Sequence, residues 1–311
     1  MTISSTDLRG IPLAARIWRD RWIYVFLLPT LLLLGAFTIY PVGASIWFSL
    51  LDWNGFDRAG TFIGLGNYTE LTRDPLFWNS FRNTLVFLAF AVPLRVGLAL
   101  LLAILLNQVF PFVRVFRTAI FLPVVTTAAI VGVVMRYVLD PTGGPLNIVL
   151  LNSGVLERPM NFLGQAGLAL YSAVGVWVWK WLGITLIYWL AALQTIPKDV
   201  LEAAEVDGAG AFDRFWHITL PLLTPFTIII TLITVIEATN VFDLMLTLTG
   251  GGPFYATEVI DIFVYRNAFI SSIPRLGYSS AAAIFFGVCF IALAIVQLIV
   301  VTRMRRRRGD A

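Results

Sequence analysis

Residues 168–193 read LALYSAVGVWVWKWLGITLIYWLAAL and contain one charged side chain, Lys180. About 20 apolar residues are enough to cross the hydrocarbon layer of a membrane as a helix. A helix that is apolar on all its faces is typical of a segment surrounded by lipid or by other helices. This stretch therefore predicts a transmembrane helix.

Five further segments have the same length and character. The six predicted spans are residues 22 to about 48, 84–106, 115–139, 168–193, 220 to about 248, and 279–301. The first is longer than the apolar part of a signal peptide and no clear cleavage site follows it, so we expect it to be retained. Only 13% of the residues are charged, against about a quarter in soluble domains. We therefore predict that the chain is an all-α integral membrane protein.

Basic residues determine the predicted orientation. They concentrate in the N-terminal tail, after the second span, and in the C-terminal run 303–308. These regions share one side if the number of spans is even, and Lys and Arg favour the cytoplasmic side. We therefore predict about six transmembrane helices with both termini in the cytoplasm. The same bias accounts for the net positive charge, so we predict membrane lipid and no nucleic acid as a partner.

The predicted spans divide the chain into successive regions. These are a cytoplasmic tail (1–21), a first transmembrane helix (22–50), an external loop (51–83), a core with five transmembrane helices (84–301) that includes a cytoplasmic loop (194–221), and a basic cytoplasmic tail (302–311). The single cysteine, Cys289, excludes an intrachain disulfide and a multi-cysteine metal site. The one histidine, His217, stands in no HExxH motif and the chain has no GxSxG motif, so we predict no catalytic residues, metal or cofactor.

The cytoplasmic loop 194–221 is acidic, which membrane anchoring does not explain. Pro197 can open a helix, and Gly208 is placed to end it with a left-handed residue. Phe212, Phe215 and Trp216 then form an apolar stripe on a predicted second short helix. Prolines 221 and 225 are expected to break the chain before the fifth span. From the residues alone, the loop either enters a groove on a partner protein or rests on lipid headgroups.

The string E-A-A-x-x-D-G-A, followed by I-x-L-P, resembles the EAA loop of permease subunits of binding-protein-dependent ABC importers. The matching residues are Glu202, Ala203, Ala204, Asp207, Gly208, Ala209, Ile218, Leu220 and Pro221. Tyr40-Pro41 and the stretches 62–68 and 248–253 further resemble the first permease of maltose and glycerol-3-phosphate systems in the carbohydrate-uptake branch. The resemblance covers nearly the whole chain. The extra N-terminal helices and large external insertion of the enterobacterial maltose subunit are lacking.

The resemblance implies the type I (MetI-like) ABC importer permease fold and several partners. They are a second permease of a different sequence, a dimer of cytoplasmic ATPase subunits, and an extracellular or periplasmic sugar-binding protein. The residues implied in ATPase coupling are Glu202, Ala203, Ala204, Asp207, Gly208, Ala209, Phe212, Phe215, Ile218 and Pro221. The chain has no P-loop motif, so ATP and magnesium would bind to the ATPase subunits. The expected location is the cytoplasmic membrane of a prokaryote.

Ionisable residues inside the spans indicate a candidate substrate path, because charge at mid-bilayer normally faces a cavity or another charge. Glu237 is deep enough to pair with Arg95 or with Lys180, and it either fixes helix packing or contacts sugar. Resembling permeases place substrate contacts on the fourth and fifth spans. The candidate path residues are Trp177, Lys180, Trp181, Ile184, Glu237, Asn240 and Val241.

Three questions stay open at the level of the sequence. The substrate is a mono-, di- or oligosaccharide, or alternatively glycerol-3-phosphate or a polyol. Residues 250–253, Gly-Gly-Gly-Pro, are expected to form a flexible external loop near the docking site of the binding protein. A secondary transporter is a rival class, but such proteins often have internal repeats, and none is found here.

Overall fold

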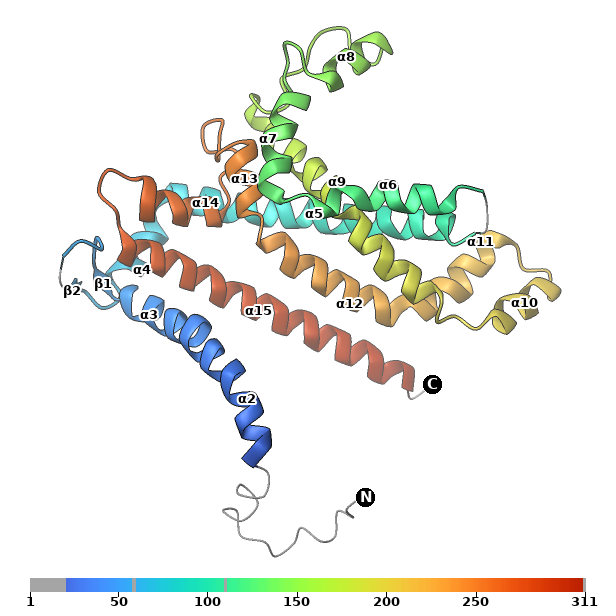
Figure 1. Cartoon of the computed structure of the whole chain (residues 1–311), viewed down its shortest axis with the longest axis horizontal. Helices are drawn as coiled ribbons and strands as arrows, with labels where there is room; N and C mark the ends of the chain where they lie inside the picture. Colours follow the sequence, from blue (N-terminus) through green and yellow to red (C-terminus); the bar gives the residue numbers. More distant parts are fainter. Residues whose placement is uncertain (1–20, 58–59, 109–110, 310–311) are drawn as a thin grey trace, which may run out of the picture.

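The structure is a computed structural model that describes residues 21–57, 60–108 and 111–309 and is mostly helical (Figure 1). The first 20 residues of the predicted N-terminal tail lie outside the described residues. The last helix continues through the basic C-terminal run, but the side chains of that run are also outside the description.

The first predicted span is a single helical rod that stands away from the core (Figure 1). It consists of α2 (Arg21–Leu34), the π-helical turn η1 (Gly35–Ile39) and α3 (Tyr40–Phe48). Residues of this rod are largely exposed within the chain, and α3 packs against the start of the last helix, α15 (Leu276–Gly309). The rod therefore needs lipid or another chain around its apolar surface.

A small layer at one end of the bundle, predicted to be external, follows the first span. It contains a two-residue antiparallel ladder, β1 (Leu51–Asp52) with β2 (Thr61–Phe62), and the helix α4 (Gly66–Arg73). Arg275 at the start of α15 donates two hydrogen bonds to the Glu70 carboxylate, at 2.7 and 2.6 Å. This bidentate pair fastens α4 to the last span.

Two long helices form the centre of the core. They are α5 (Pro75–Leu106) and α9 (Ala166–Leu193), which pack against each other along their lengths. Helix α5 begins before the predicted start at residue 84, because the Asp74 carboxylate accepts a bond from the Leu76 N–H at 2.8 Å and Pro75 occupies the first turn. Residues 75–83, which we assigned to the predicted external loop, therefore belong to α5.

Two spans that we predicted as continuous are broken. The third is split into α6 (Val113–Val125) and α7 (Ala128–Val138), which meet at 104°. The fifth ends with α12 (Leu220–Thr239), and α13 (Phe242–Leu248) follows as a separate helix. The two outer halves, α7 and α13, pack together.

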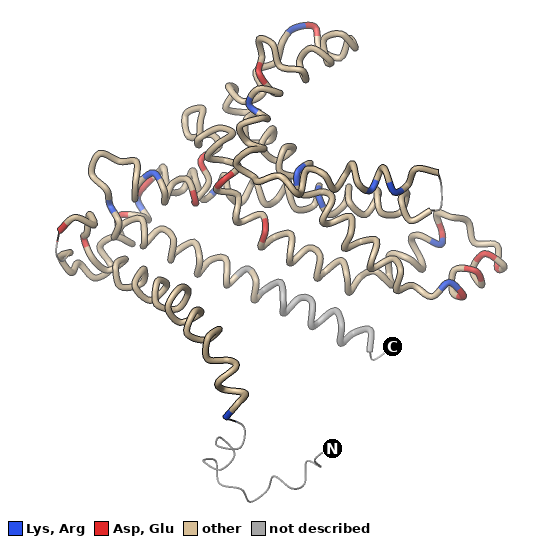
Figure 2. The backbone as a smooth tube through the Cα atoms, viewed as in Figure 1, with Lys and Arg blue, Asp and Glu red and all other residues tan. Residues whose placement is uncertain are grey.

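One end of the bundle carries α10 (Lys198–Val206), α11 (Ala211–Arg214) and the π turn η2 (Phe215–Thr219), and the opposite end carries α14 (Ile260–Tyr265) and the π turn η3 (Arg266–Ile270). Helix α8 (Pro145–Asn152) projects beyond α7, away from both ends (Figure 1). Figure 2 shows charged residues gathered mainly at the ends, with long uncharged stretches between them.

Within the described residues, four helices are long and apolar enough to cross a membrane, or five if the bent α6–α7 pair is one span. Helix α15 adds a further apolar helix, whose described part, Leu276–Ala292, is shorter. The helical architecture agrees with the predicted integral membrane class of about six spans.

Candidate functional site

The loop predicted to be cytoplasmic, residues 194–221, has the predicted bend. Helix α10 starts after Pro197 and stops at Asp207, and Gly208 follows with a φ of +83°. The Ala209 N–H donates to the Ala204 carbonyl at 2.9 Å, and the Gly208 N–H donates to the Glu205 carbonyl at 3.1 Å. These bonds complete a left-handed C-terminal cap, so the conformation predicted for Gly208 is confirmed.

The residues of the EAA string lie on an accessible surface. Glu202, Ala203, Asp207 and Gly208 are exposed, whereas Ala204, Ala209, Phe215, Ile218 and Pro221 are partly buried. Large apolar side chains border this surface, with Val206 88% and Phe212 74% exposed. Apolar exposure of this kind is typical of an interface with a partner or a membrane.

The second helix of the loop is not a separate short helix. Helices α11, η2 and α12 run without a break from Ala211 to Thr239, so the predicted interruption at prolines 221 and 225 is wrong. The Leu220 N–H donates to the Phe215 carbonyl, which forms a π turn directly before Pro221. This wider turn accommodates the proline ring and its missing N–H, and the helix continues.

An ion pair joins the two arms of the loop. The Arg214 guanidinium on α11 contacts the Glu205 carboxylate on α10, across the Gly208 bend. The rings of Phe215 and Trp216 lie edge to face, 5.6 Å apart. The loop is thus a folded unit whose second arm continues directly into α12, while its first arm, α10, follows α9 after residues 194–197.

Deep in the core, Arg95 on α5 pairs with Glu237 on α12. Nη2 of Arg95 lies 2.7 Å from Oε2 of Glu237; the Arg95 side chain is fully buried and that of Glu237 is 32% exposed. The guanidinium also lies over the Trp177 ring, 4.8 Å from its centroid. Glu237 therefore pairs with Arg95 and not with Lys180, the other predicted candidate.

Lys180 has different partners. Its Nζ donates to the carbonyl oxygens of Thr126, at 2.7 Å, and Pro123, at 3.5 Å, where the third span breaks. It also lies 4.1 Å from the centroid of the Trp181 ring. Trp177 and Lys180 are therefore inside the chain, whereas Trp181 and Ile184 are partly buried at the edge of that face.

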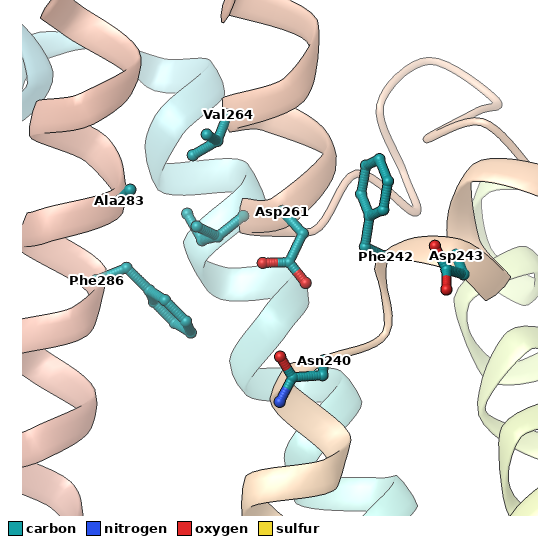
Figure 3. Close-up of a pocket in the computed structure, with 8 residues that line it drawn as sticks. Asn240, Phe242, Asp243, Asp261, Val264, Ala283 and Phe286 are labelled. Carbon is teal, nitrogen blue, oxygen red and sulfur yellow. The ribbon is translucent and has the colours of Figure 1, made fainter. Parts of the chain in front are cut away.

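The break after α12 opens into a cavity of about 480 Å³ lined by Asn240 at the end of α12, by the start of α13, and by α14 and α15 (Figure 3). Asn240 is exposed there, while Val241 is buried. The Asp261 carboxylate points toward Asn240 (Figure 3) and accepts a bond from the Val241 N–H. Burial raises the pKa of Asp261 to about 6.

The loop at 250–253, which we predicted to be external and flexible, is held by hydrogen bonds to neighbouring residues. Thr257 Oγ1 donates to the Gly252 carbonyl at 2.6 Å, and Asn79 and Asn83 on α5 both donate to the Tyr255 carbonyl. Nearby, Arg266 Nε donates to the buried Glu258 carboxylate at 2.6 Å. The loop is therefore fixed to the core.

Sequence reasoning missed Asp261 and Glu258, because both belong to the stretch interpreted as an external loop. The Ser80 hydroxyl donates to Glu258, and the Val241 backbone N–H donates to Asp261; neither contact is visible in the local sequence. An acidic residue within an otherwise apolar run such as 258–265 was the available hint.

The chain is thus a bundle of membrane-length helices with a bent, exposed loop at one end. Residues 10–306 match the family of binding-protein-dependent transport system inner membrane components. The chain belongs to this family and is a permease subunit of the ABC importer class.

Several relatives agree over most of their length. The chain is 33% identical to the probable ABC transporter permease protein YurN of Bacillus subtilis, covering 88% of this chain and 94% of the relative. It is 31% identical to the sn-glycerol-3-phosphate transport system permease protein UgpA of Yersinia pestis, covering 91% and 95%.

A solved structure is also similar. A chain of the bacterial alginate ABC transporter, in complex with an alginate pentasaccharide-bound periplasmic protein, matches with a TM-score of 0.79 and 26% identity. The match covers 95% of this chain and 97% of that chain. The predicted permease family and fold are therefore confirmed.

Proposed function

We propose that this chain forms, with a second permease of different sequence, the membrane path of an ATP-driven importer for a sugar. A solute-binding protein delivers the sugar from outside a prokaryotic cytoplasmic membrane. The observation that carries the proposal is the exposed loop 194–221, a capped helix and a bend whose first arm follows core helix α9 and whose second arm continues into core helix α12.

In this proposal the loop docks on a cytoplasmic ATPase dimer, which binds ATP and magnesium. The exposed residues Glu202, Ala203, Asp207 and Gly208 face the ATPase, and Phe212 fills an apolar recess on it. Ala204, Ala209, Phe215, Ile218 and Pro221 support this surface from behind, consistent with their partial burial. Small side chains permit close approach of α10 to a groove.

The sugar path follows the facing sides of α9 and α12. Trp181, Ile184, Glu237 and Asn240 are accessible enough to meet a ligand, since each is exposed or partly buried. An aromatic face, a carboxylate and an amide suit sugar rings and hydroxyls. Trp177 and Val241 form the buried backing of this surface.

Glycerol-3-phosphate or a polyol is a second candidate substrate, favoured by the 31% identity to the UgpA permease. Binding of sugars, polyols and glycerol-3-phosphate to the cognate binding protein, measured as a panel, distinguishes a sugar substrate from glycerol-3-phosphate or a polyol.

Reconstitution in liposomes tests the assembly. The lone chain is expected to give no uptake, with or without an ion gradient, and uptake is expected when the ATPase, the second permease, the binding protein and ATP are present. Ion-driven uptake by the lone chain would instead identify a secondary transporter.

A further inference from the structure

Lys180 lies in the core beside the break in the third span. It is 1% exposed, and no acidic side chain pairs with it among the described residues. A buried ammonium without a carboxylate partner is costly inside a membrane protein. Its position therefore requires other partners of negative character.

Those partners are backbone carbonyls at the end of a half-helix. In a continuous helix the Pro123 carbonyl would accept from the Thr127 N–H, four residues later. At the break, Thr126 and Thr127 have extended backbones, with ψ of 143° and 148°, so this pattern stops. Lys180 Nζ donates to the Thr126 and Pro123 carbonyls instead. A cation here also suits the negative end of the α6 dipole.

The helices are close enough for this cap because of Gly183. A Cβ at Gly183 would lie 2.6 Å from the Ile120 carbonyl oxygen and 2.7 Å from the Phe121 Cα, both on α6. Gly183 is three residues after Lys180 and therefore on the same side of α9. The glycine and the lysine together fasten α9 to the end of α6.

Helix α9 leads from this contact to the cytoplasmic loop. It continues from Lys180 to Leu193, roughly 20 Å at 1.5 Å per residue, and α10 begins at Lys198. A displacement of the loop 194–221 that moves α9 along its axis thus also moves Lys180. The Lys180 ammonium passes this movement to the break between α6 and α7 through its two carbonyl partners.

We propose that Lys180 is a positioning residue that caps α6, the first half of the broken third span, and makes the break move with the loop 194–221. It does so through backbone carbonyls and does not bind the transported molecule. The inference rests on the proposed function, because it assumes that an ATPase drives the loop.

Accessibility of the break tests this role. In the assembled transporter carrying Cys289→Ser, Thr126→Cys is labelled with a membrane-impermeant maleimide, with and without a non-hydrolysable ATP analogue. The labelling rate with Lys180 present is expected to change with the analogue. Lys180→Met should reduce that change about tenfold, the scale of a lost charged hydrogen bond, while the ATPase still co-purifies.

Two variants exclude a merely structural effect. Lys180→Arg keeps a cation and donors and should restore the change in labelling, whereas Gly183→Ala, which separates the helices, should reduce it with the lysine in place. Trp179→Met, on the exposed side of α9, is the matched control and should have no effect.

The possible failures are distinguishable. If Lys180→Met labels as the parent does in both states, the inference is overturned and the proposed function stands. If the parent transporter itself shows no response to the analogue, the proposed ATP-driven function fails and the inference falls with it. Lys180→Gln provides the same comparison if the methionine variant does not assemble.

Discussion

The Arg95 guanidinium is fully buried, and Glu237 is its one charged partner among the described residues. Its Nε and Nη1 atoms have no hydrogen-bond partner there. Removing one member of a buried pair leaves the other charge uncompensated, which costs more than the intact pair contributes. The stability of the core therefore depends on Glu237 even if this carboxylate also meets substrate.

Replacing Glu237 with Gln should lower the stability of the purified chain by roughly 3 kcal/mol, measured by thermal unfolding in detergent. The matched control is Glu205→Gln, which removes the exposed partner of Arg214 and should cost less than about 1 kcal/mol. Equal losses in the two variants would contradict a buried ion pair.

Gly208 offers a second test at a single residue. Its φ of +83° costs other L-residues roughly 1–2 kcal/mol, while a Cβ there would meet nothing within 4 Å. Gly208→Asp should therefore reduce ATPase co-purification and uptake through the backbone and not through a clash, with membrane insertion unchanged.

Gly210→Asp is the matched control for this substitution. Gly210 is the N-cap of α11 with a φ of −65°, a position that Asp favours. Retention of the ATPase by both variants would remove the support for docking through this bend.

Among the elements, the external loop after α13 presents Phe254 at 93% exposure on a fixed backbone. Phe254 and Tyr255 both have positive φ, of 48° and 62°, a conformation that non-glycine residues rarely hold without support. Exposed aromatic residues on rigid supports are frequent anchors of interfaces.

Phe254→Ala should weaken the affinity of the assembled transporter for its binding protein at least about tenfold, measured by surface plasmon resonance. Phe56→Ala is the matched control, because Phe56 is 82% exposed but lies in a short turn whose side-chain bonds, from Asn54 and Trp53, are local to residues 53–57. An unchanged Kd for Phe254→Ala would exclude this loop from the docking surface.

Asp261 on α14 gives the external end a pH dependence. Its pKa is raised from 3.8 to about 6 by burial, so the folded state binds this proton more tightly than the unfolded chain. The stability contributed by the protonated form is present below pH 4 and is lost as the pH rises from about 4 to 6.

Asp261→Asn should flatten the fall of the unfolding temperature between pH 4 and 6, and should raise stability at pH 7. Asp243→Asn, an exposed neighbour in the same cavity, should keep the fall. An unaltered pH profile in Asp261→Asn would show that the carboxyl is ionised throughout this range.

Hydrophobic runs were sufficient to predict the spans, and the spacing within the EAA string was sufficient to predict the capped helix. The breaks were not predictable. The break at Thr126 and Thr127 has no glycine or proline at these two positions. Asn240 follows an apolar run and is a weaker helix-ending residue than glycine or proline. What stabilises these breaks is Lys180 and Asp261, which are remote in sequence and reach them only in the folded chain.

For the whole molecule, the loop containing α10 and the external layer containing β1 and β2 lie at opposite ends of the bundle (Figure 1). If the bundle crosses a membrane, the two ends face different compartments. The predicted orientation places α10 in the cytoplasm, where an ATPase is available.

Cysteines introduced at Asp207 and at Phe56, in a Cys289→Ser background, should be labelled from opposite sides of sealed vesicles. The Phe56 cysteine should react with an impermeant reagent in whole spheroplasts, and the Asp207 cysteine only in inverted vesicles. Labelling of the Asp207 cysteine from outside would rule out the proposed coupling.

The π turns η1 and η2 each end two residues before a proline, at Pro41 and Pro221. Each adds a residue to its helix, which offsets the side chains on either side by about 100° relative to an uninterrupted α-helix. Deleting Thr219 would therefore leave hydropathy and length nearly intact, yet turn the Phe212 face by about a quarter revolution against α12. The number of residues in η2 thus sets the rotation of the Phe212 face relative to α12. Deleting one codon would change that rotation and uncouple the two parts without removing any functional side chain.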